Sequence, residues 1–253
     1  MAQLSGSVGR GGLNRKPDVR LVQGLLNNYT IPGIANPIKI DGKAGHKTYT
    51  RIEVFQKKVL LKIKPDGRVD PNGQSFKKLT NRPGSKLASA CTVSTKAINL
   101  LKSIEMLRTK PYDDQTSKEI TQWLNGATIG YGHLISKGDW VKYKKGLTKT
   151  EALALFKKDL APFTKKIKHL VKSKIMPYEF DAMVILIFNI GQSAFQRSSI
   201  LKLVNNPGAK TPFDSLEKAW KVWNKRKKKY VKGLANRRKA EWNIYTKNIY
   251  RKW

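Results

Sequence analysis

The segment EMLRTKPYDD, residues 105–114, lies where a helical pattern gives way to turn signals. Three apolar residues at helical spacing come before it: Ile98, Leu101 and Ile104. They predict a helix that begins near Thr95 and buries this face. Because a proline disfavours helical backbone in the residue before it, Pro111 leads us to expect that the helix ends near Arg108. The segment therefore joins a helix to a region of shorter, irregular structure.

Glu105 and Asp114 stand at the two ends of this segment, nine positions apart. Glu105 falls late in the predicted helix, where the negative end of the helix dipole and partial burial would both raise its pKa. Two carboxyl groups that flank a bond are the requirement for glycoside hydrolysis. A solvated helical glutamate and an aspartate that starts a turn fit the same residues. The spacing alone leaves both interpretations open.

The residues that follow predict a small irregular sheet and then helices. Residues 112–135 combine turn signals with short β-prone pieces, among them TIGYGH at 128–133. From Thr148 onward the chain is predicted to be helical, and Thr148 with Glu151 forms the capping-box pattern that opens a helix.

One later stretch is apolar almost all round and predicts the buried centre of the C-terminal part. Pro177 suits the first turn of this helix, which runs through Asn189 until Gly191 stops it. Further helices are predicted over 199–205, 214–224 and 234–248. The fold class that these patterns indicate is α+β and mostly helical.

The N-terminal part predicts a separate module of three short helices. Apolar residues at helical spacing indicate a helix over 18–28, with Asp18 as its N-cap. A second helix begins at about Lys47, and a third spans about 75–79. Turns that contain Asp-Gly and Asn-Gly separate these helices.

The 253 residues are enough for one large domain or two small ones. Residues 83–93, which follow the module, are small and polar and are typical of a linker. We therefore predict a module over 1–82, a linker over 83–93 and a second domain over 94–253.

Charge is the most unusual feature of the composition. The chain has 51 basic and 17 acidic residues, for a net charge of +34, and both parts are basic. Lys225 to Lys229 form a continuous basic block, which fits either a solvated helix end or a contact with phosphate groups. A field of this sign attracts nucleic acid, anionic lipid or an acidic wall polymer, and charge alone does not choose among them.

Several classes of protein are disfavoured by composition. No apolar run approaches the roughly 20 residues of a membrane-spanning helix. Met1 to Gly12 lack the apolar core of a signal peptide, so we expect synthesis in the cytoplasm. The single cysteine, Cys91, excludes an intramolecular disulfide and a cysteine-based zinc site. Three scattered histidines argue against a hydrolytic zinc site.

Four motifs, in this order, resemble the phage-type lysozymes, the endolysins of glycoside hydrolase family 24. They are EMLRTKPYDD at 105–114, TIGYGH at 128–133, FNIG at 188–191 and GLANRRKAE at 233–241. The resemblance covers about 96–250 and implies a domain with a sheet lobe and a helical lobe. The sequence departs from the family where Met106 replaces the usual glycine, and where 13 residues separate Asp114 from Thr128. Asp113, beside Asp114, leaves the choice of aspartate open.

The resemblance implies roles for three residues and no metal or cofactor. Glu105 would donate a proton to the departing oxygen, Asp114 would deprotonate a water molecule, and Thr128 would hold that water. Such inversion requires carboxyl groups roughly 6.5–9.5 Å apart, whereas retention with Asp114 as the nucleophile requires about 5–5.5 Å. The sequence contains no distance, so inversion is an expectation from the family. His133 is expected to be structural, and no substrate-binding residue is assigned.

The N-terminal part resembles a three-helix peptidoglycan-binding domain. The motifs that carry this resemblance are VGRGG at 8–12, DGKAG at 41–45 with Thr48, and Phe55-Gln56. The resemblance implies that the module docks the enzyme onto the wall. A helical cap that only packs on the enzyme is the alternative.

We therefore expect a modular phage endolysin that hydrolyses the β-1,4 bond between N-acetylmuramic acid and N-acetylglucosamine and lyses the host cell. A non-catalytic cationic protein that binds envelopes or nucleic acid would explain the charge, but not the order of Glu105, Asp114 and Thr128. A lytic transglycosylase, in which Glu105 works alone, is a third possibility.

The expected partner is peptidoglycan, together with anionic phosphates of the outer envelope. We expect a monomer that binds no nucleic acid. A holin-type partner would open the membrane and release the enzyme from the host cytoplasm to the wall.

Overall fold

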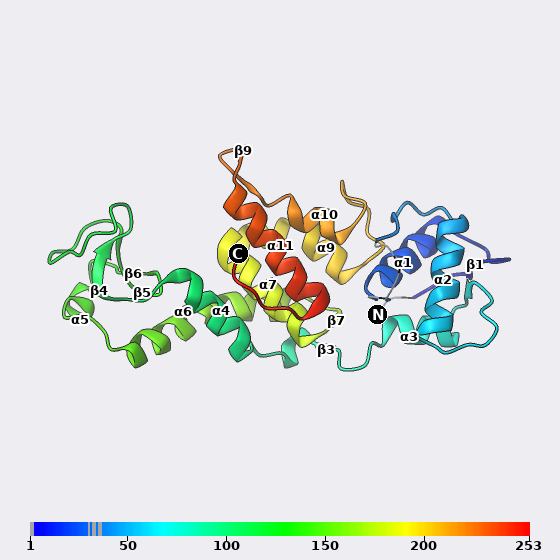
Figure 1. Ribbon diagram of the computed structural model, residues 1–253, viewed down its shortest axis with the longest axis horizontal. Coiled ribbons are helices and arrows are strands. Elements are labelled where there is room, and N and C mark those ends of the chain that lie inside the picture. The colour runs from blue at the N-terminus through cyan, green and yellow to red at the C-terminus, as the bar shows by residue number, and fades with distance from the viewer. Residues whose placement is uncertain (1–2, 30, 32–33, 35–36) are drawn as a thin grey trace.

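The computed structural model describes residues 3–29, 31, 34 and 37–253. The chain is drawn out along one axis into an N-terminal helical module, a central helical lobe and a lobe with a small sheet (Figure 1). Each contains its own cluster of buried apolar side chains. The expectation of a mostly helical α+β fold is confirmed. Within the described residues, no helix is long and apolar enough to cross a membrane.

The N-terminal module has three helices and one short pair of strands. Its elements are β1 (Val8–Gly9), α1 (Lys16–Asn27), α2 (His46–Lys58), β2 (Arg68–Val69) and α3 (Gln74–Thr80). The two strands pair antiparallel. Val22, Ile52 and Phe55 are completely buried where the helices meet. The helices lie within two residues of their predicted bounds.

Asp18 is not the N-cap of α1, contrary to the prediction. The helix begins at Lys16, because Pro17 fits its first turn, and Arg15 takes the cap position. Asp18 is therefore inside the helix and buried. Its carboxylate accepts hydrogen bonds from the Ser5 backbone N–H at 3.0 Å and the Ser5 hydroxyl at 2.7 Å, and so anchors the start of the chain on α1.

The segment that was expected to be a linker packs on the helical lobe. Strand β3 (Lys86–Leu87) pairs antiparallel with β7 (Lys174–Ile175), and a 3-10 turn follows at Ala88–Ala90. Ala88 and Cys91 are completely buried in the core of that lobe. Burial raises the pKa of the Cys91 thiol. Small side chains are common both in closely packed segments and in loose linkers. Composition alone therefore could not distinguish a packed segment from a linker here.

The helical lobe is built around α7 (Pro177–Ile190), whose residues 179–187 are all buried. The other helices are α4 (Thr95–Glu105), α6 (Lys149–Leu170), α8 (Gln192–Arg197), α9 (Ser199–Asn205), α10 (Leu216–Lys221) and α11 (Lys232–Lys247). Helix α11 packs along α7. The predicted capping box of Thr148 and Glu151 is present at the start of α6, and Gly191 ends α7 at a φ of 85°.

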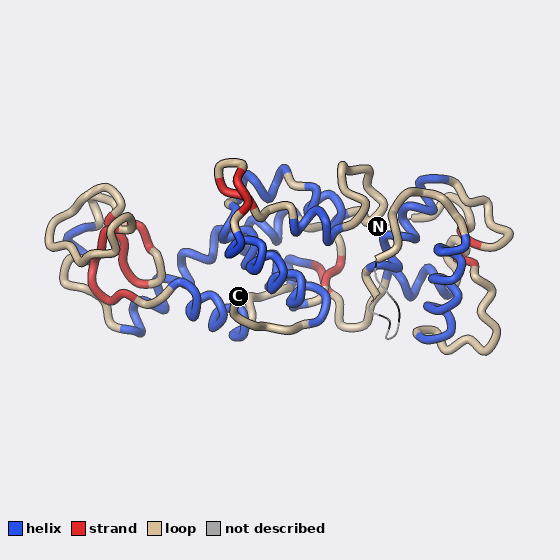
Figure 2. Tube along the Cα trace, turned by 45° about the horizontal axis from the view of Figure 1, so that its top comes forward, coloured by secondary structure: helices blue, strands red, loops and turns tan. Residues whose placement is uncertain are grey.

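The basic block at 225–229 does not end a helix. It forms a hairpin of β8 (Lys225–Arg226) and β9 (Lys229–Tyr230), and α10 stops earlier than predicted, at Lys221. The two residues between the strands, Lys227 and Lys228, have φ values of 47° and 64°. Figure 2 shows this hairpin standing out from the helices around it.

The sheet lobe lies at the far end of the molecule from the N-terminal module (Figure 2). Strands β4 (Arg108–Asp113), β5 (Ala127–Gly130) and β6 (His133–Leu134) form an antiparallel sheet with β5 in the middle, and α5 (Trp140–Tyr143) follows. Helix α6 contacts both this sheet and α7, and so connects the two lobes. The predicted sheet is therefore present, and its first strand begins soon after α4 ends.

Candidate active site

Glu105 is the last residue of α4, so it stands where the helical lobe passes into the sheet lobe. Its side chain is half-buried, and burial raises the pKa of its carboxyl group. The positive charge of Arg237, on α11, acts in the opposite direction. Burial has the larger effect, so the protonated acid is favoured beyond the usual range of a glutamate.

Met106 makes the turn that takes the chain from α4 into β4. Its φ is 40° and its ψ is 120°, a conformation that a side chain with a Cβ rarely adopts. This is the position at which the resemblance expects glycine. The backbone geometry of the turn is therefore kept although the residue that would adopt it freely is missing.

Asp114 and Thr128 are joined through one carbonyl group. The Asp114 backbone N–H donates to the Gly126 carbonyl at 3.1 Å, and the Thr128 hydroxyl donates to the same oxygen at 2.9 Å. Thr128 is buried, whereas Asp114 is exposed. The 13 residues between the two loop out and return to this carbonyl, so the insertion does not separate them.

Gly126 is a residue of this site that the sequence did not single out. Its φ is 99°, and a Cβ added there would lie 2.5 Å from the Asp114 carboxylate oxygen Oδ1. A larger residue at 126 would therefore displace the carboxylate. Nothing in the local sequence identifies this glycine among the others in the chain.

The two neighbouring aspartates have different surroundings. The Asp113 carboxylate accepts hydrogen bonds from the Gln115 backbone N–H at 3.0 Å and the Thr116 hydroxyl at 2.7 Å, and the Thr116 bond lowers its pKa. The Asp114 carboxylate forms no hydrogen bond or ion pair with the residues that the structure describes. Asp113 therefore organises the turn, and Asp114 has a carboxylate available for a ligand.

Tyr112 lies within the electrostatic reach of both candidate carboxyl groups. Burial raises the pKa of its phenol, and the negative charges of Glu105 and Asp114 raise it further, while Arg108 lowers it. The Arg108 guanidinium lies 4.9 Å from the centre of the Tyr112 ring. Glu105, at the end of α4, and Asp114, just after β4, therefore act on the same side chain.

A buried ionic cluster supports the face of α11 that approaches Glu105. Glu241 is fully buried and lies 3.1 Å from Arg237 and 3.0 Å from Arg238. Arg238 also donates to the Asn189 side chain at 2.6 Å, and the Trp220 indole N–H donates to Glu241 at 3.0 Å. Burial lowers the pKa of Arg238 to about 10. Two of the quoted motifs, at 188–191 and 233–241, meet in this cluster.

His133 has the structural position that was expected. Its Nδ1 atom lies 3.0 Å from both carboxylate oxygens of Asp159 on α6, which ties β6 to that helix. Among the residues described by the structure, no group of three or more His, Cys, Asp or Glu side chains could hold a metal ion.

Comparison with known proteins places this geometry in a family. The phage lysozyme family model matches residues 102–241, which is more than half of the chain and includes Glu105, Asp114 and Thr128. The chain belongs to the phage lysozyme family. The matched region begins within α4 and ends within α11, so it contains the sheet lobe and most of the helical lobe.

Several phages encode endolysins that are similar to this chain. The endolysin of Bacillus phage PZA is 31% identical over 163 residues, which is 63% of this chain and 58% of the relative. The endolysin of Acyrthosiphon pisum secondary endosymbiont phage 1 is 34% identical over 154 residues, which is 59% of this chain and 94% of the relative. The chain thus spans less than two thirds of the PZA protein.

A solved structure of an endolysin from Escherichia coli O157:H7 phage FAHEc1 superimposes with a TM-score of 0.52 at 29% identity. It covers 64% of this chain and 98% of that protein. The match therefore takes in nearly the whole of that neighbour, and about a third of this chain lies outside it.

Proposed function

We propose that this chain is a muramidase of phage origin, which hydrolyses the β-1,4 bond between N-acetylmuramic acid and N-acetylglucosamine in bacterial peptidoglycan and so lyses the host cell. The observation that carries the proposal is Glu105, a carboxyl group of raised pKa between two lobes, with Asp114 and Thr128 on the adjoining sheet. The phage endolysins among its relatives support the same activity.

In this mechanism Glu105 is the general acid. Its raised pKa keeps the proton that the leaving oxygen requires. Asp114, exposed and without a partner among the described side chains, is the base that deprotonates water. The Thr128 hydroxyl donates its hydrogen to the Gly126 carbonyl. Its oxygen lone pairs can therefore accept a hydrogen bond from that water. We propose inversion, and no metal or cofactor is needed.

Glu105→Gln tests the catalytic role. The variant loses the acidic proton but keeps the shape of the side chain, so clearing of purified walls should fall by at least about a hundredfold while binding to the walls is retained. Glu119→Gln, an equal change of charge at an exposed position, is the control and should clear walls like the parent. A Glu105→Gln protein that clears walls at the parental rate leaves only a cationic binding protein.

We also propose that the N-terminal module binds peptidoglycan and keeps the catalytic lobes near their substrate. Support comes from its own buried core and from its motifs. Full-length Glu105→Gln protein on insoluble peptidoglycan should show slowed amide hydrogen exchange in α1 or α2 as well as near Glu105. Protection confined to the two lobes would reduce the module to a helical cap.

The hairpin β8–β9 is the proposed contact with anionic phosphates of the outer envelope. Its five consecutive basic residues are exposed, and none of their side chains forms an ion pair or hydrogen bond within the part of the chain that is described. By contrast, Lys218 and Lys221, just before it, are paired with Asp214 and Glu217. Exposed charges without partners remain available to a polyanion.

Phosphatidylglycerol vesicles test this contact. A variant with Lys225, Lys227 and Lys229 changed to Gln should bind them at least about tenfold more weakly at low salt, and the difference should shrink at high salt because exposed charges are screened. The control changes Lys144, Lys157 and Lys158 to Gln, which removes the same charge from other exposed positions. Equal loss in both variants would assign the effect to net charge.

The same proposal includes a monomeric enzyme that binds no nucleic acid and is made in the host cytoplasm. A holin-type partner would then give it access to the wall. The phage endolysins among its relatives support an enzyme that must reach the wall.

A further inference from the structure

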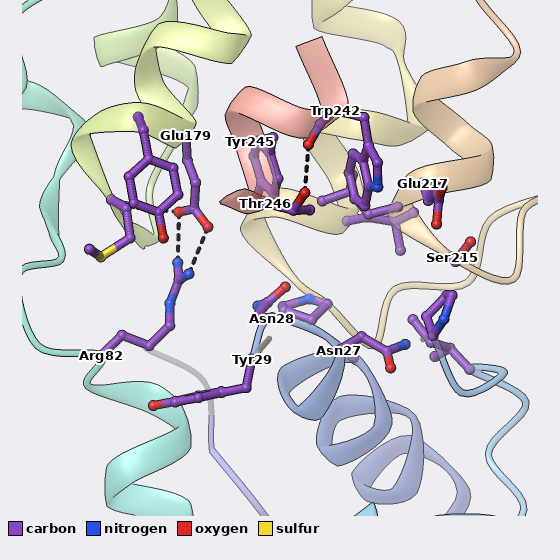
Figure 3. A pocket seen from close by; sticks show the side chains of 18 of the residues that line it. Asn27, Asn28, Tyr29, Arg82, Glu179, Ser215, Glu217, Trp242, Tyr245 and Thr246 are labelled. Atoms are coloured by element: carbon purple, nitrogen blue, oxygen red, sulfur yellow. Dashed lines mark hydrogen bonds and ion pairs between the residues drawn. The ribbon is translucent and has the colours of Figure 1, made fainter. Parts of the chain in front are cut away.

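A cavity of about 310 Å³ lies between the N-terminal module and the helical lobe (Figure 3). The end of α1, with Asn28, Tyr29, Pro37 and Ile40, forms one wall. The start of α7, the start of α10 and the second half of α11 form the other. Arg82 and Pro83, which lead from the module to the lobe, lie at its edge. Glu105, Asp114 and Thr128 do not line it, so it is distinct from the candidate active site.

The charged groups of this cavity neutralise one another. Arg82 donates two hydrogen bonds to Glu179, at 2.6 and 2.7 Å, and Glu217 is paired with Lys221. Arg82, Glu179 and Glu217 are the charged residues among the described residues that line the cavity, and Lys221 lies beside it. In a chain of net charge +34, the cavity therefore presents neither a free cation nor a free anion, and it favours an uncharged ligand.

Three neutral hydrogen-bonding groups that line the cavity have no partner among the described residues. The Asn28 side chain, the Tyr178 hydroxyl and the Trp242 indole N–H form no hydrogen bond with any described part of the chain. Figure 3 shows Asn28 reaching from the end of α1 toward Thr246 on α11. Groups that are half-buried and unpaired favour a ligand that can supply their missing hydrogen bonds.

Aromatic surface accompanies these polar groups. Trp242 stacks on Tyr245 with ring centres 5.4 Å apart and an interplanar angle of 9°, and it remains partly exposed. Tyr29 and Tyr178 also line the space. A sugar ring has apolar faces that suit aromatic rings, and hydroxyl and acetamide groups at its edge that suit neutral donors and acceptors. The volume is near the lower limit of small-ligand sites, which is about 300 Å³.

We propose that this cavity binds an N-acetylated amino sugar of a glycan strand. The inference rests on the proposed function, because peptidoglycan is the polymer that would bring such a sugar to the interface. Its uncharged backbone fits the neutral cavity, whereas its acidic peptides would meet no free cation there. Helix α11 carries Arg237 toward Glu105 and Trp242 toward the cavity, so one rigid element lies beside both sites.

Tri-N-acetylchitotriose, added to the full-length Glu105→Gln protein, tests the proposal by amide hydrogen exchange. We expect protection in two separate places, near Glu105 and at the cavity, where the end of α1 and residues 242–246 should exchange more slowly. Asn28→Ala with Tyr178→Phe should weaken the cavity protection roughly tenfold and leave protection near Glu105 unchanged, since it removes two neutral hydrogen-bonding groups. Tyr230→Phe, on the exposed hairpin, is the matched control.

The results distinguish failure of the sugar site from failure of the proposed function. Protection near Glu105 alone, or cavity protection that the double variant does not change, overturns the sugar site. The proposed function fails separately, if the parent protein does not cleave purified walls. Tyr178→Phe removes one oxygen, and Asn28 has helical backbone angles that alanine accepts, so the double variant should fold. Thermal unfolding checks this.

Discussion

Glu105 has a carboxyl group whose charged form is disfavoured by its position. Burial raises its pKa in the folded protein, and the unfolded chain has the ordinary value of about 4.5. The folded state therefore holds the proton more tightly, so this group's contribution to stability is complete below the unfolded pKa and is lost as pH rises through the folded pKa. If Glu105 is the general acid, as proposed, activity should fall over the same rise because the acid loses its proton.

Glu105→Gln is accordingly expected to raise the melting temperature at neutral pH, because it removes a carboxylate that burial disfavours. The gain should shrink at a pH well below the ordinary value of about 4.5, where the glutamate is protonated in both states. Thermal unfolding at the two pH values, with Glu119→Gln as the control, measures this difference. A gain of the same size at both pH values would contradict the assigned pKa shift.

Met106 supplies a second test at the scale of one residue. Its positive φ costs about 1–3 kcal/mol, and glycine at the same place would lose about 0.5–1 kcal/mol through backbone freedom. Met106→Gly should therefore raise the free energy of unfolding by about 1 kcal/mol, or roughly 2–4 °C in melting temperature. Met106→Ala keeps a Cβ and should bring no such gain. Equal stability of the two variants would show that the turn is not strained.

At the scale of elements, the sequence predicted what local physics determines. Pro177 and Gly191 bound α7, and the capping box starts α6, because these residues act on their own backbone. The hairpin at 225–230 was missed because five basic residues carry no turn signal, and the glycine or asparagine that such a turn favours is absent.

Asparagine and glycine, which the hairpin turn lacks, should make the turn more stable. Lys227 and Lys228 both have left-handed backbone, at roughly 1–2 kcal/mol for each residue. Changing Lys227 to Asn and Lys228 to Gly should stabilise the protein by about 1–2 kcal/mol and weaken its binding to anionic vesicles. Lys157→Gln with Lys158→Gln, on α6, removes the same charge without changing a turn. If that control gives the same stability, charge rather than backbone strain explains the gain.

At the scale of the candidate site, some residues were predicted from the sequence and others were found only in the structure. Glu105, Asp114 and Thr128 came from the resemblance to a family, and their roles stay predictions. The Gly126 carbonyl accepts a hydrogen bond from Asp114, 12 positions away in the sequence. The charge of Arg237 acts on Glu105, 132 positions away. No local pattern contains such contacts.

At the scale of the whole molecule, the module and the helical lobe are closely packed. Arg20 donates to the carbonyls of Gly208 and Ala209, at 3.0 Å each. A Cβ on Gly24 would lie 2.3 Å from the carbonyl oxygen of Pro207. These contacts join residues far apart in the sequence through backbone atoms and small residues, so composition could not predict them.

The Arg82–Glu179 pair is an ion pair across this interface. The side chains are 14% and 3% exposed, so Arg82→Ala would leave Glu179 buried without its partner. We expect the free energy of unfolding to fall by about 3–5 kcal/mol. Lys62→Ala breaks the more exposed pair with Asp66 and should cost no more than about 1 kcal/mol. Equal losses in denaturant unfolding would mean that the interface pair is as solvated as the surface pair.

The masses of the fragments released from purified peptidoglycan test the central claim most directly. If Glu105 protonates the leaving oxygen and Asp114 directs water to the sugar, each cut leaves one reducing end, and that fragment is one water heavier than its anhydro form. Glu105→Gln should release these fragments at least about a hundredfold more slowly. Anhydro ends from the parent protein would show that Glu105 works without water as a lytic transglycosylase does. Release of fragments by the Glu105→Gln protein at the parental rate would remove Glu105 from the reaction altogether.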